Sequence, residues 1–272
     1  MESSSVSYDV IRELVLARSG IVLSAGKDYL IESRMRPLIK AGEAESLGEL
    51  VDRLRKNPRD SIVEKVVDAL TTNETSFYRD SSPFDCMREK LIPEILERNA
   101  KTRTLRLWCA ASSSGQEPYS VAIMLRESFP QLASWKIEFI ATDISESMLE
   151  RCRNAEYSQL EITRGLPAQL LTKYFEKHGL KWRIKESIRS MVDFERVNLI
   201  SDPPPMPVAD LVLMRNVLIY FGDETKQKII DKVSRLLRPD GFLMLGSAET
   251  VWRDDFERET YSGWGYYRRT NK

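Results

Sequence analysis

The sequence predicts an α/β protein in which an open, largely parallel sheet follows a small all-helical domain. Residues 8–70 carry apolar side chains at helical spacing, with no strong strand pattern. From about residue 84, short apolar runs alternate with helical patterns, which is typical of right-handed βαβ units in a parallel sheet. We therefore divide the chain into a helical domain at 1–70, a linker at 71–83 and a sheet domain at 84–272.

The composition is that of an ordinary globular protein of 272 residues, with 42% hydrophobic and 30% charged residues. Lysine plus arginine and aspartate plus glutamate both number 41, which argues against a nucleic-acid surface spread over the whole chain. Cys86, Cys109 and Cys152 form no CxxC pair and His178 is the one histidine, so we expect neither a metal site nor a disulfide framework. We find no membrane-length apolar run and no signal-peptide pattern, and expect a cytoplasmic protein.

The helical domain carries basic residues at Lys27, Arg34, Arg36 and Lys40. They could form a docking surface. Acidic residues such as Glu32 are interleaved with them, however, and we favour a solvated helix face.

The linker at 71–79 is polar, then aromatic, then basic. It is compatible with a plain connection between domains. Because junctions between domains are favoured places for ligand sites, the same residues could instead line a cleft. The sequence leaves both interpretations open.

The first strand of the sheet domain is predicted at 105–110. Five small residues, Ala111–Gly115, follow it, and a helix begins near Glu117 and runs to about residue 128. Small residues let the backbone approach a ligand closely. In an open α/β sheet, ligands bind at the carboxyl ends of the strands, so this loop is the first candidate for a binding site.

The remaining elements continue the alternation with one interruption. Residues 154–190 combine a helical pattern with a short exposed strand, and we interpret them as an insertion; His178 lies there beside Gly179 and is expected at the surface. Further strands are predicted at 136–143, 192–199, 210–214 and 241–246, a helix at 223–237 and a closing antiparallel hairpin at 256–269.

Polar residues gather where these strands end: Glu117 after the first strand, Asp143 on the second, Asn198 on the third, and Arg215 and Asn216 after the fourth. An acid at the end of the second strand is placed to accept hydrogen bonds from ribose hydroxyls, which indicates a nucleoside-containing cofactor. Each residue also has a structural interpretation, as a helix cap or a turn residue. Their occurrence at successive strand ends favours a shared site.

The loop narrows the choice of cofactor. The GxGxxG pattern that suits a pyrophosphate and the GxxxxGK[ST] pattern that suits a triphosphate are both absent. A nucleoside ligand without phosphates is S-adenosylmethionine, whose sulfonium and amino groups are cationic. Glu117 could then meet the amino group, and Arg79 from the linker could bind the carboxylate.

Four segments resemble the chemotaxis receptor methyltransferases of the CheR type: Thr72–Arg79 (Thr-Asn-Glu-Thr-Ser-Phe-Tyr-Arg), Ala110–Ser120 (Ala-Ala-Ser-Ser-Ser-Gly-Gln-Glu-Pro-Tyr-Ser), Thr142–Ile144 (Thr-Asp-Ile) and Arg215–Phe221 (Arg-Asn-Val-Leu-Ile-Tyr-Phe). Leu237–Leu243 fits the same pattern, and the likeness runs in order from about residue 8 to 270. The resemblance implies a class I S-adenosylmethionine-dependent methyltransferase domain with a Rossmann-like sheet, a small N-terminal helical domain and a small inserted β subdomain. It also implies transfer of the methyl group to glutamate carboxylates on the cytoplasmic helices of chemoreceptors, in chemotactic adaptation, with S-adenosylhomocysteine as product.

The resemblance assigns roles residue by residue. Asn73, Thr75 and Arg79 reach the cofactor from the linker, and Glu117 and Asp143 hold its amino-acid and ribose parts. Asn198 and Leu199 border the adenine, while Arg215 and Asn216 line the methyl-transfer end. Tyr220 is implied near the reacting groups. An arginine in the helix before the first strand is implied as a second catalytic residue, and Arg98 is the nearest match.

One departure concerns the inserted subdomain. Some members of the family use a longer loop there to grip a receptor's C-terminal pentapeptide, and the segment 174–184 is a few residues shorter. We therefore expect no such tethering. We also expect a monomer that neither binds nucleic acid nor inserts into the membrane. A catalytically silent S-adenosylmethionine-binding sensor or adaptor and a small-molecule methyltransferase remain alternatives.

Overall fold

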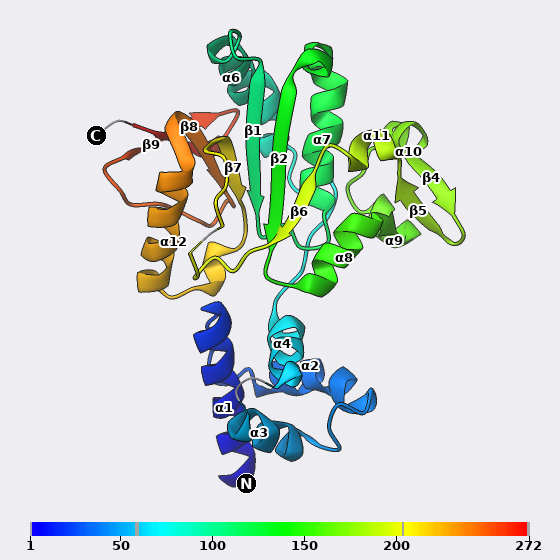
Figure 1. Cartoon of the computed structure of the whole chain (residues 1–272), viewed down its shortest axis with the longest axis vertical. Coiled ribbons are helices and arrows are strands. Elements are labelled where there is room, and N and C mark those ends of the chain that lie inside the picture. The colour runs from blue at the N-terminus through cyan, green and yellow to red at the C-terminus, as the bar shows by residue number, and fades with distance from the viewer. Residues whose placement is uncertain (1, 58–59, 203, 271–272) are drawn as a thin grey trace. The chain divides into compact units, whose positions relative to one another are not determined.

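The computed structural model describes residues 2–57, 60–202 and 204–270. The chain forms two compact units (Figure 1). One comprises the residues up to Thr72 together with Tyr220–Gln227, and the other comprises Asn73–Ile219 and the residues from Lys228 onward. The segment 73–83, which we expect to be a linker, thus clusters with the sheet unit.

The first unit is built on four helices, α1 (Glu2–Ser19), α2 (Asp28–Lys40), α3 (Leu47–Lys56) and α4 (Ser61–Leu70). Side-chain caps start two of them, because Ser46 accepts from the Glu49 N–H and Asp60 from the Ile62 N–H. Apolar residues at helical spacing form its core, among them Ile11, Ile31, Met35, Leu50, Ile62 and Val66. The helical prediction for this domain is confirmed.

The second unit holds a seven-stranded sheet of order β6-β2-β1-β7-β8-β10-β9. Its strands are β1 (Thr104–Ala110), β2 (Lys136–Asp143), β6 (Asp193–Arg196), β7 (Ala209–Met214), β8 (Leu237–Leu245), β9 (Phe256–Tyr261) and β10 (Trp264–Arg269). The first five are parallel, and β10 is antiparallel to both β8 and β9. Every residue of β7 is buried, as expected for a central strand.

The helices of this unit are α5 (Ser82–Cys86), the π-helical η1 (Met87–Leu91), α6 (Ile92–Arg98), α7 (Gln116–Ser128), η2 (Pro130–Ser134), α8 (Glu146–Asn154), η3 (Leu218–Tyr220) and α12 (Asp223–Leu236); the ends of η3 and α12 belong to the first unit. The π-helical turn η1 precedes Pro93, which has no N–H to donate to a helical ladder.

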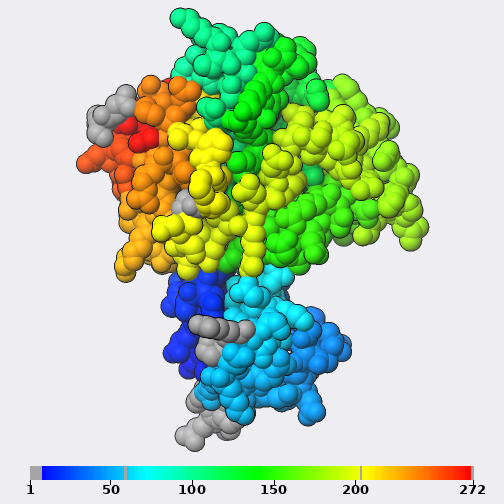
Figure 2. All heavy atoms as spheres, viewed as in Figure 1, coloured from blue at the N-terminus to red at the C-terminus, as the bar shows by residue number. Residues whose placement is uncertain are grey.

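The insertion forms a separate three-stranded antiparallel sheet of order β3-β5-β4. It comprises β3 (Glu156–Tyr157), α9 (Gln159–Thr163), α10 (Ala168–Tyr174), β4 (Phe175–His178), β5 (Lys181–Ile184) and α11 (Glu186–Arg189). In Figure 2 its yellow-green atoms pack without a gap against the green atoms of the α7–α8 region. His178 lies at the surface as expected, with its Nδ1 2.7 Å from Glu156 Oε1.

Candidate functional site

The loop between β1 and α7 has an uncommon backbone. Ala111 (φ 57°) and Ser113 (φ 50°) adopt the left-handed region without being glycine, and Gly115 (φ 92°) closes the loop. At Gly115 a Cβ would lie 3.1 Å from both the Cys152 Sγ and the Tyr157 Oη, so a side chain has little room there. Left-handed non-glycine residues are sparse in proteins and cluster at ligand sites. The backbone of this loop therefore supports the prediction that the candidate site is centred on it.

Asp143, the last residue of β2, holds this loop. Its Oδ2 accepts from the Ser113 N–H at 2.7 Å, its Oδ1 accepts from the Ser145 N–H at 2.9 Å, and the residue is 5% exposed. A carboxylate offers about four acceptor positions, so these two bonds are compatible with contacts to ribose hydroxyls. The turn role and the ligand role that the sequence left as alternatives can thus coexist.

Glu117 and Arg215 form a partly buried ion pair at the same edge. Arg215 Nη1 donates to Glu117 Oε2 at 2.6 Å, and Arg215 Nη2 donates to the Arg79 carbonyl at 2.9 Å and to Asp80 Oδ2 at 2.8 Å. The Arg215 side chain is only 1% exposed. Arg215 therefore joins the end of β7 to the start of α7 and to the segment 79–80.

The second oxygen of Glu117 faces a thiol. Cys109 Sγ donates to Glu117 Oε1 at 3.2 Å. Burial, reinforced by the Glu117 charge, raises the pKa of the Cys109 thiol well above its ordinary value, which keeps the proton on sulfur. Both oxygens of Glu117 are thus positioned by neighbours at the start of α7.

The segment 73–80 lines a cavity. Ser113 Oγ donates to the Asn73 carbonyl at 2.9 Å, and the Tyr78 N–H donates to Ser120 Oγ at 3.0 Å. Residues 74–80 surround a cavity of about 340 Å³ with Arg164 and Gly165 of the insertion. Thr75 and Arg79 thus line a hollow together with the insertion, and the strand-end residues Glu117, Asp143 and Arg215 do not contribute to its lining.

The insertion packs against the segment 73–80. Phe77 is fully buried and packs edge-on against Tyr157, with ring centroids 4.9 Å apart. Gly165 (φ 102°) comes so close that a Cβ would lie 2.0 Å from the Phe77 carbonyl oxygen. Arg164 pairs with Glu74 at 2.7 Å and lowers the pKa of that carboxyl. This contact could not be predicted from sequence, because Arg164-Gly165 has the pattern of an ordinary helix C-terminus.

Asn198 and Leu199 follow β6 and run close to Asp143, whose carbonyl accepts from the Val197 N–H at 3.0 Å. Lys232 of α12 was not among the expected site residues. It holds this segment, since its Nζ donates to the Ile200 carbonyl at 2.6 Å and the Ser201 carbonyl at 2.8 Å. Burial lowers the pKa of Lys232.

Asn216, after β7, is left-handed (φ 56°), and its N–H donates to Glu249 Oε2 at 2.7 Å. Glu249 is buried and was not among the expected site residues. The expected residues Asn73, Thr75, Arg79, Glu117, Asp143, Asn198, Leu199, Arg215 and Asn216 all belong to the sheet unit and come from its strand ends and the segment 73–80.

Two expected catalytic residues are not part of this group. Arg98 Nη2 donates to Asp210 Oδ1 at 3.1 Å, and Asp210 is near the amino end of β7, at the opposite edge of the sheet. The geometry thus gives Arg98 no support as a catalytic residue. Tyr220 ends η3 and belongs to the first unit, where its carbonyl accepts from the Val22 N–H at 2.9 Å.

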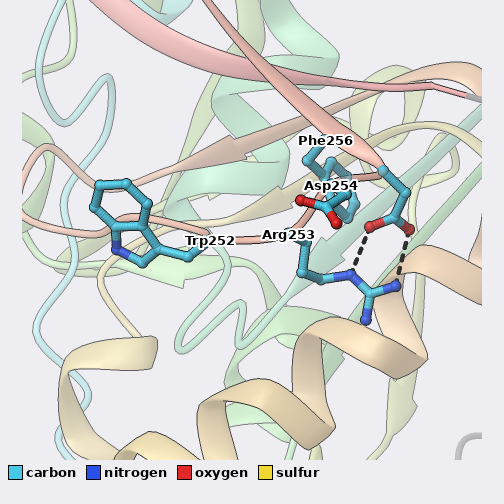
Figure 3. Close-up of a pocket in the computed structure, with 5 residues that line it drawn as sticks. Trp252, Arg253, Asp254 and Phe256 are labelled. Atoms are coloured by element: carbon cyan, nitrogen blue, oxygen red, sulfur yellow. Dashed lines mark hydrogen bonds and ion pairs between the residues drawn. The ribbon is translucent and has the colours of Figure 1, made fainter. Parts of the chain in front are cut away.

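A second hollow, of about 1,040 Å³, lies on the segment between β8 and β9 and is lined by Trp252–Phe256 (Figure 3). Arg253 is tied there to Asp255, with Nε 2.6 Å from Oδ1, and none of the expected site residues contributes to the lining. Among the described residues, no cluster of histidine, cysteine, aspartate and glutamate could hold a metal ion, and no helix is long and apolar enough to span a membrane.

The sheet order, the tight loop after β1 and the acid that ends β2 define a Rossmann-like fold whose ligand site lies at the carboxyl ends of the parallel strands. The site residues fit S-adenosylmethionine: small left-handed residues allow close backbone approach, the carboxylates of Asp143 and Glu117 lie beside the loop, and the sequence has no phosphate-binding loop.

Comparison with known proteins identifies the family. Residues 73–263 match the model of the CheR methyltransferase SAM-binding domain, and residues 7–71 match that of the CheR all-alpha domain. The chain belongs to the CheR methyltransferase family, and its cofactor is S-adenosylmethionine.

Curated relatives agree with this family. The chain is 40% identical over 255 residues to the chemotaxis protein methyltransferase Cher2 of Pseudomonas putida, covering 92% of each chain. It is 39% identical to chemotaxis protein methyltransferase 1 of Pseudomonas aeruginosa, again over 92% of each. It is 34% identical to the chemotaxis protein methyltransferase of Borreliella burgdorferi, over 88% of this chain and 86% of the relative.

Proposed function

We propose that this protein methylates glutamate side chains on the cytoplasmic helices of chemoreceptors, as a protein-glutamate O-methyltransferase of chemotactic adaptation. The observation that carries the proposal is the strand-end group of Glu117, Asp143 and Arg215 around a left-handed loop, in a chain whose relatives are named chemotaxis protein methyltransferases.

In this proposal the cofactor is held from two sides. Asp143 receives the ribose hydroxyls, and Asn198 and Leu199 border the adenine. Glu117 and Arg79 meet the charged ends of the amino-acid part, while Asn73 and Thr75 contact it from the segment 73–80. Arg215 and Asn216 line the methyl-transfer end. Two hydrogen bonds of Arg215 support these roles. One goes to Glu117 and the other to the Arg79 carbonyl, so Arg215 joins the start of α7 to the segment 73–80.

The chemistry needs no general base. S-adenosylmethionine supplies an activated methyl group: a carboxylate oxygen of the acceptor forms the new C–O bond while the sulfur keeps the electron pair of the breaking S–C bond. A glutamate side chain has a pKa of about 4.3, so it is already anionic at neutral pH. This agrees with the surface position of His178. The protein need only exclude water and orient the acceptor, a role that we assign to the Tyr220 hydroxyl.

The test is incubation with methyl-labelled S-adenosylmethionine and receptor-containing membranes, with receptor-free membranes as control. The proposal expects alkali-labile label on the receptors, as a glutamate methyl ester requires. Alkali-stable label would point to nitrogen or carbon acceptors. Cofactor binding without any transfer would instead favour the catalytically silent sensor, and label confined to low-molecular-weight material would favour a small-molecule methyltransferase.

We further propose that receptors are engaged without tethering of their C-terminal pentapeptide. The hairpin β4–β5 is short, with Gly179 and Leu180 alone between its strands. Calorimetric titration with a tail pentapeptide should give no measurable heat of binding. Tight binding would show that the short hairpin suffices for tethering.

A further inference from the structure

Glu249 is a buried carboxylate that binds the backbone of another strand's end. It lies between β8 and β9 and is 7% exposed. Its Oε2 accepts from the Asn216 N–H and from the Gly246 N–H, each at 2.7 Å, and its Oε1 accepts from the Ile219 N–H at 3.3 Å. One side chain thus fixes the segment after β7 at two points and joins it to the end of β8.

A tight turn and a glycine allow the Glu249 carboxylate to reach the segment after β7. Its own N–H donates to the Gly246 carbonyl at 3.0 Å, which forms a tight turn and directs the side chain back toward β7. At Gly246 a Cβ would lie 2.6 Å from Asn216 Nδ2 and 2.8 Å from Glu249 Oε2, so a glycine is required where the two segments meet.

The contact stabilises an unfavourable backbone. Asn216 is left-handed, and non-glycine residues pay for that conformation unless the surroundings impose it. Bonds from N–H groups to an ionised acceptor are stronger than neutral ones. Asn216 is one of the residues that we place at the methyl-transfer end, and the segment that follows leads to Tyr220.

We infer that Glu249 is a positioning residue for methyl transfer, an inference that rests on the proposed function. It acts through Asn216 and the backbone up to Ile219, which it holds in the shape that the transfer end of the site needs. Because small misplacements of reacting groups cost large factors in rate, loss of this carboxylate should lower turnover more than cofactor affinity.

The test compares Glu249→Gln with the wild type and with Glu257→Gln, the same chemical change at an exposed position of β9. The amide of the glutamine presents N–H groups to backbone N–H groups and cannot accept on both sides. We expect the kcat for receptor methylation to fall about 10- to 100-fold. The Kd for S-adenosylhomocysteine should change less than about threefold, because only the end of the site is disturbed.

A second variant, Gly246→Ala, disturbs the same contact without altering the carboxylate and should give the same split between kcat and Kd. Thermal unfolding of each variant shows whether it is folded at the assay temperature. If folded Glu249→Gln keeps the kcat of the wild type within twofold, or loses affinity as much as kcat, the inference is wrong. Absence of receptor methylation by the wild type would instead overturn the proposed function itself.

Discussion

The two ends of β7 both carry buried charges, but they are built differently. Near the amino end, the Asp210 carboxylate accepts from Arg98 Nη2 at 3.1 Å, Asn99 Nδ2 at 3.0 Å, Arg238 Nη1 at 2.9 Å and the Arg106 N–H at 2.9 Å. Four donors match the acceptor capacity of one carboxylate. This end is a saturated cluster that ties α6, β1 and β8 to β7.

At the carboxyl end, the charges hold a strained backbone instead. Asp143 and Glu249 accept chiefly from backbone N–H groups of left-handed or adjoining residues. Five non-glycine residues with positive φ occur in the segments at this edge, Tyr78, Asp80, Ala111, Ser113 and Asn216, against Arg103 and Asp240 at the amino edge. Such conformations persist where the surrounding structure imposes them, and they cluster at functional sites. Buried charge thus joins elements at the amino edge of the sheet, and at the carboxyl edge it holds the shape of the loops that follow β2 and β7.

The largest expected effect is a loss of stability when the Asp210 cluster at the amino end of β7 is removed. Asp210→Ala leaves four donors without their acceptor, so the free energy of unfolding should fall by about 3–5 kcal/mol, as for other broken buried ion pairs. Urea denaturation measures this change, with the exposed Asp254→Ala as control. Affinity for S-adenosylhomocysteine should stay within threefold of the wild type under native conditions. A folded Asp210→Ala protein that has lost cofactor affinity would contradict the view that the amino-end cluster serves stability alone.

The next effect concerns the carboxyl end. Asp143→Ala removes a charged acceptor, and the loss of even one hydrogen bond to it costs about 1.5–3 kcal/mol, so S-adenosylhomocysteine should bind at least about 10- to 100-fold more weakly. Isothermal titration calorimetry measures the change, and unaltered affinity would refute the ribose role. Asp143→Asn keeps the size of the side chain, and its affinity for S-adenosylhomocysteine should lie between those of the wild type and Asp143→Ala.

A smaller effect is expected from Tyr220→Phe. Loss of one orienting hydrogen bond should lower turnover about tenfold while cofactor affinity stays within twofold. Receptor methylation rates and calorimetry test the two halves, with Tyr29→Phe on exposed α2 as the matched control. Unchanged turnover would remove Tyr220 from the mechanism.

The smallest effect concerns the thiols beneath the loop. Burial raises the pKa of Cys109 and Cys152, so both remain protonated and unreactive in the folded protein at pH 8. The unfolded chain releases these protons near pH 8.5. The free energy of unfolding should therefore decrease as the pH rises above about 8.5, because the native state retains protons that the unfolded state loses.

Labelling with a thiol reagent at pH 8, with and without urea, checks the same point. Reaction should be slow in buffer and fast in urea. Fast labelling of Cys109 or Cys152 without urea would mean that the loop opens readily.

Periodicity and strand ends allowed much of this molecule to be predicted from sequence. The sheet strands and the grouping of Glu117, Asp143 and Arg215 follow from local patterns, since parallel strands bring their carboxyl ends to one edge. The roles of Gly165, Lys232 and Glu249 could not be predicted from sequence, because their contacts join segments far apart in the chain and no local pattern indicates them. Arg98 as a catalytic residue stays a prediction: a helical pattern does not tell which edge of the sheet its last turn will reach, and its guanidinium lies beside Asp210 near the amino end of β7.

The most direct test of the account is a crystal structure of the protein with S-adenosylhomocysteine. We expect the nucleoside against Asp143, with its hydroxyls bonded to that carboxylate, and the amino-acid part between the loop Ala111–Gly115 and Arg79. A ligand in the hollow at Trp252–Phe256, or one that does not contact Asp143, would contradict the account.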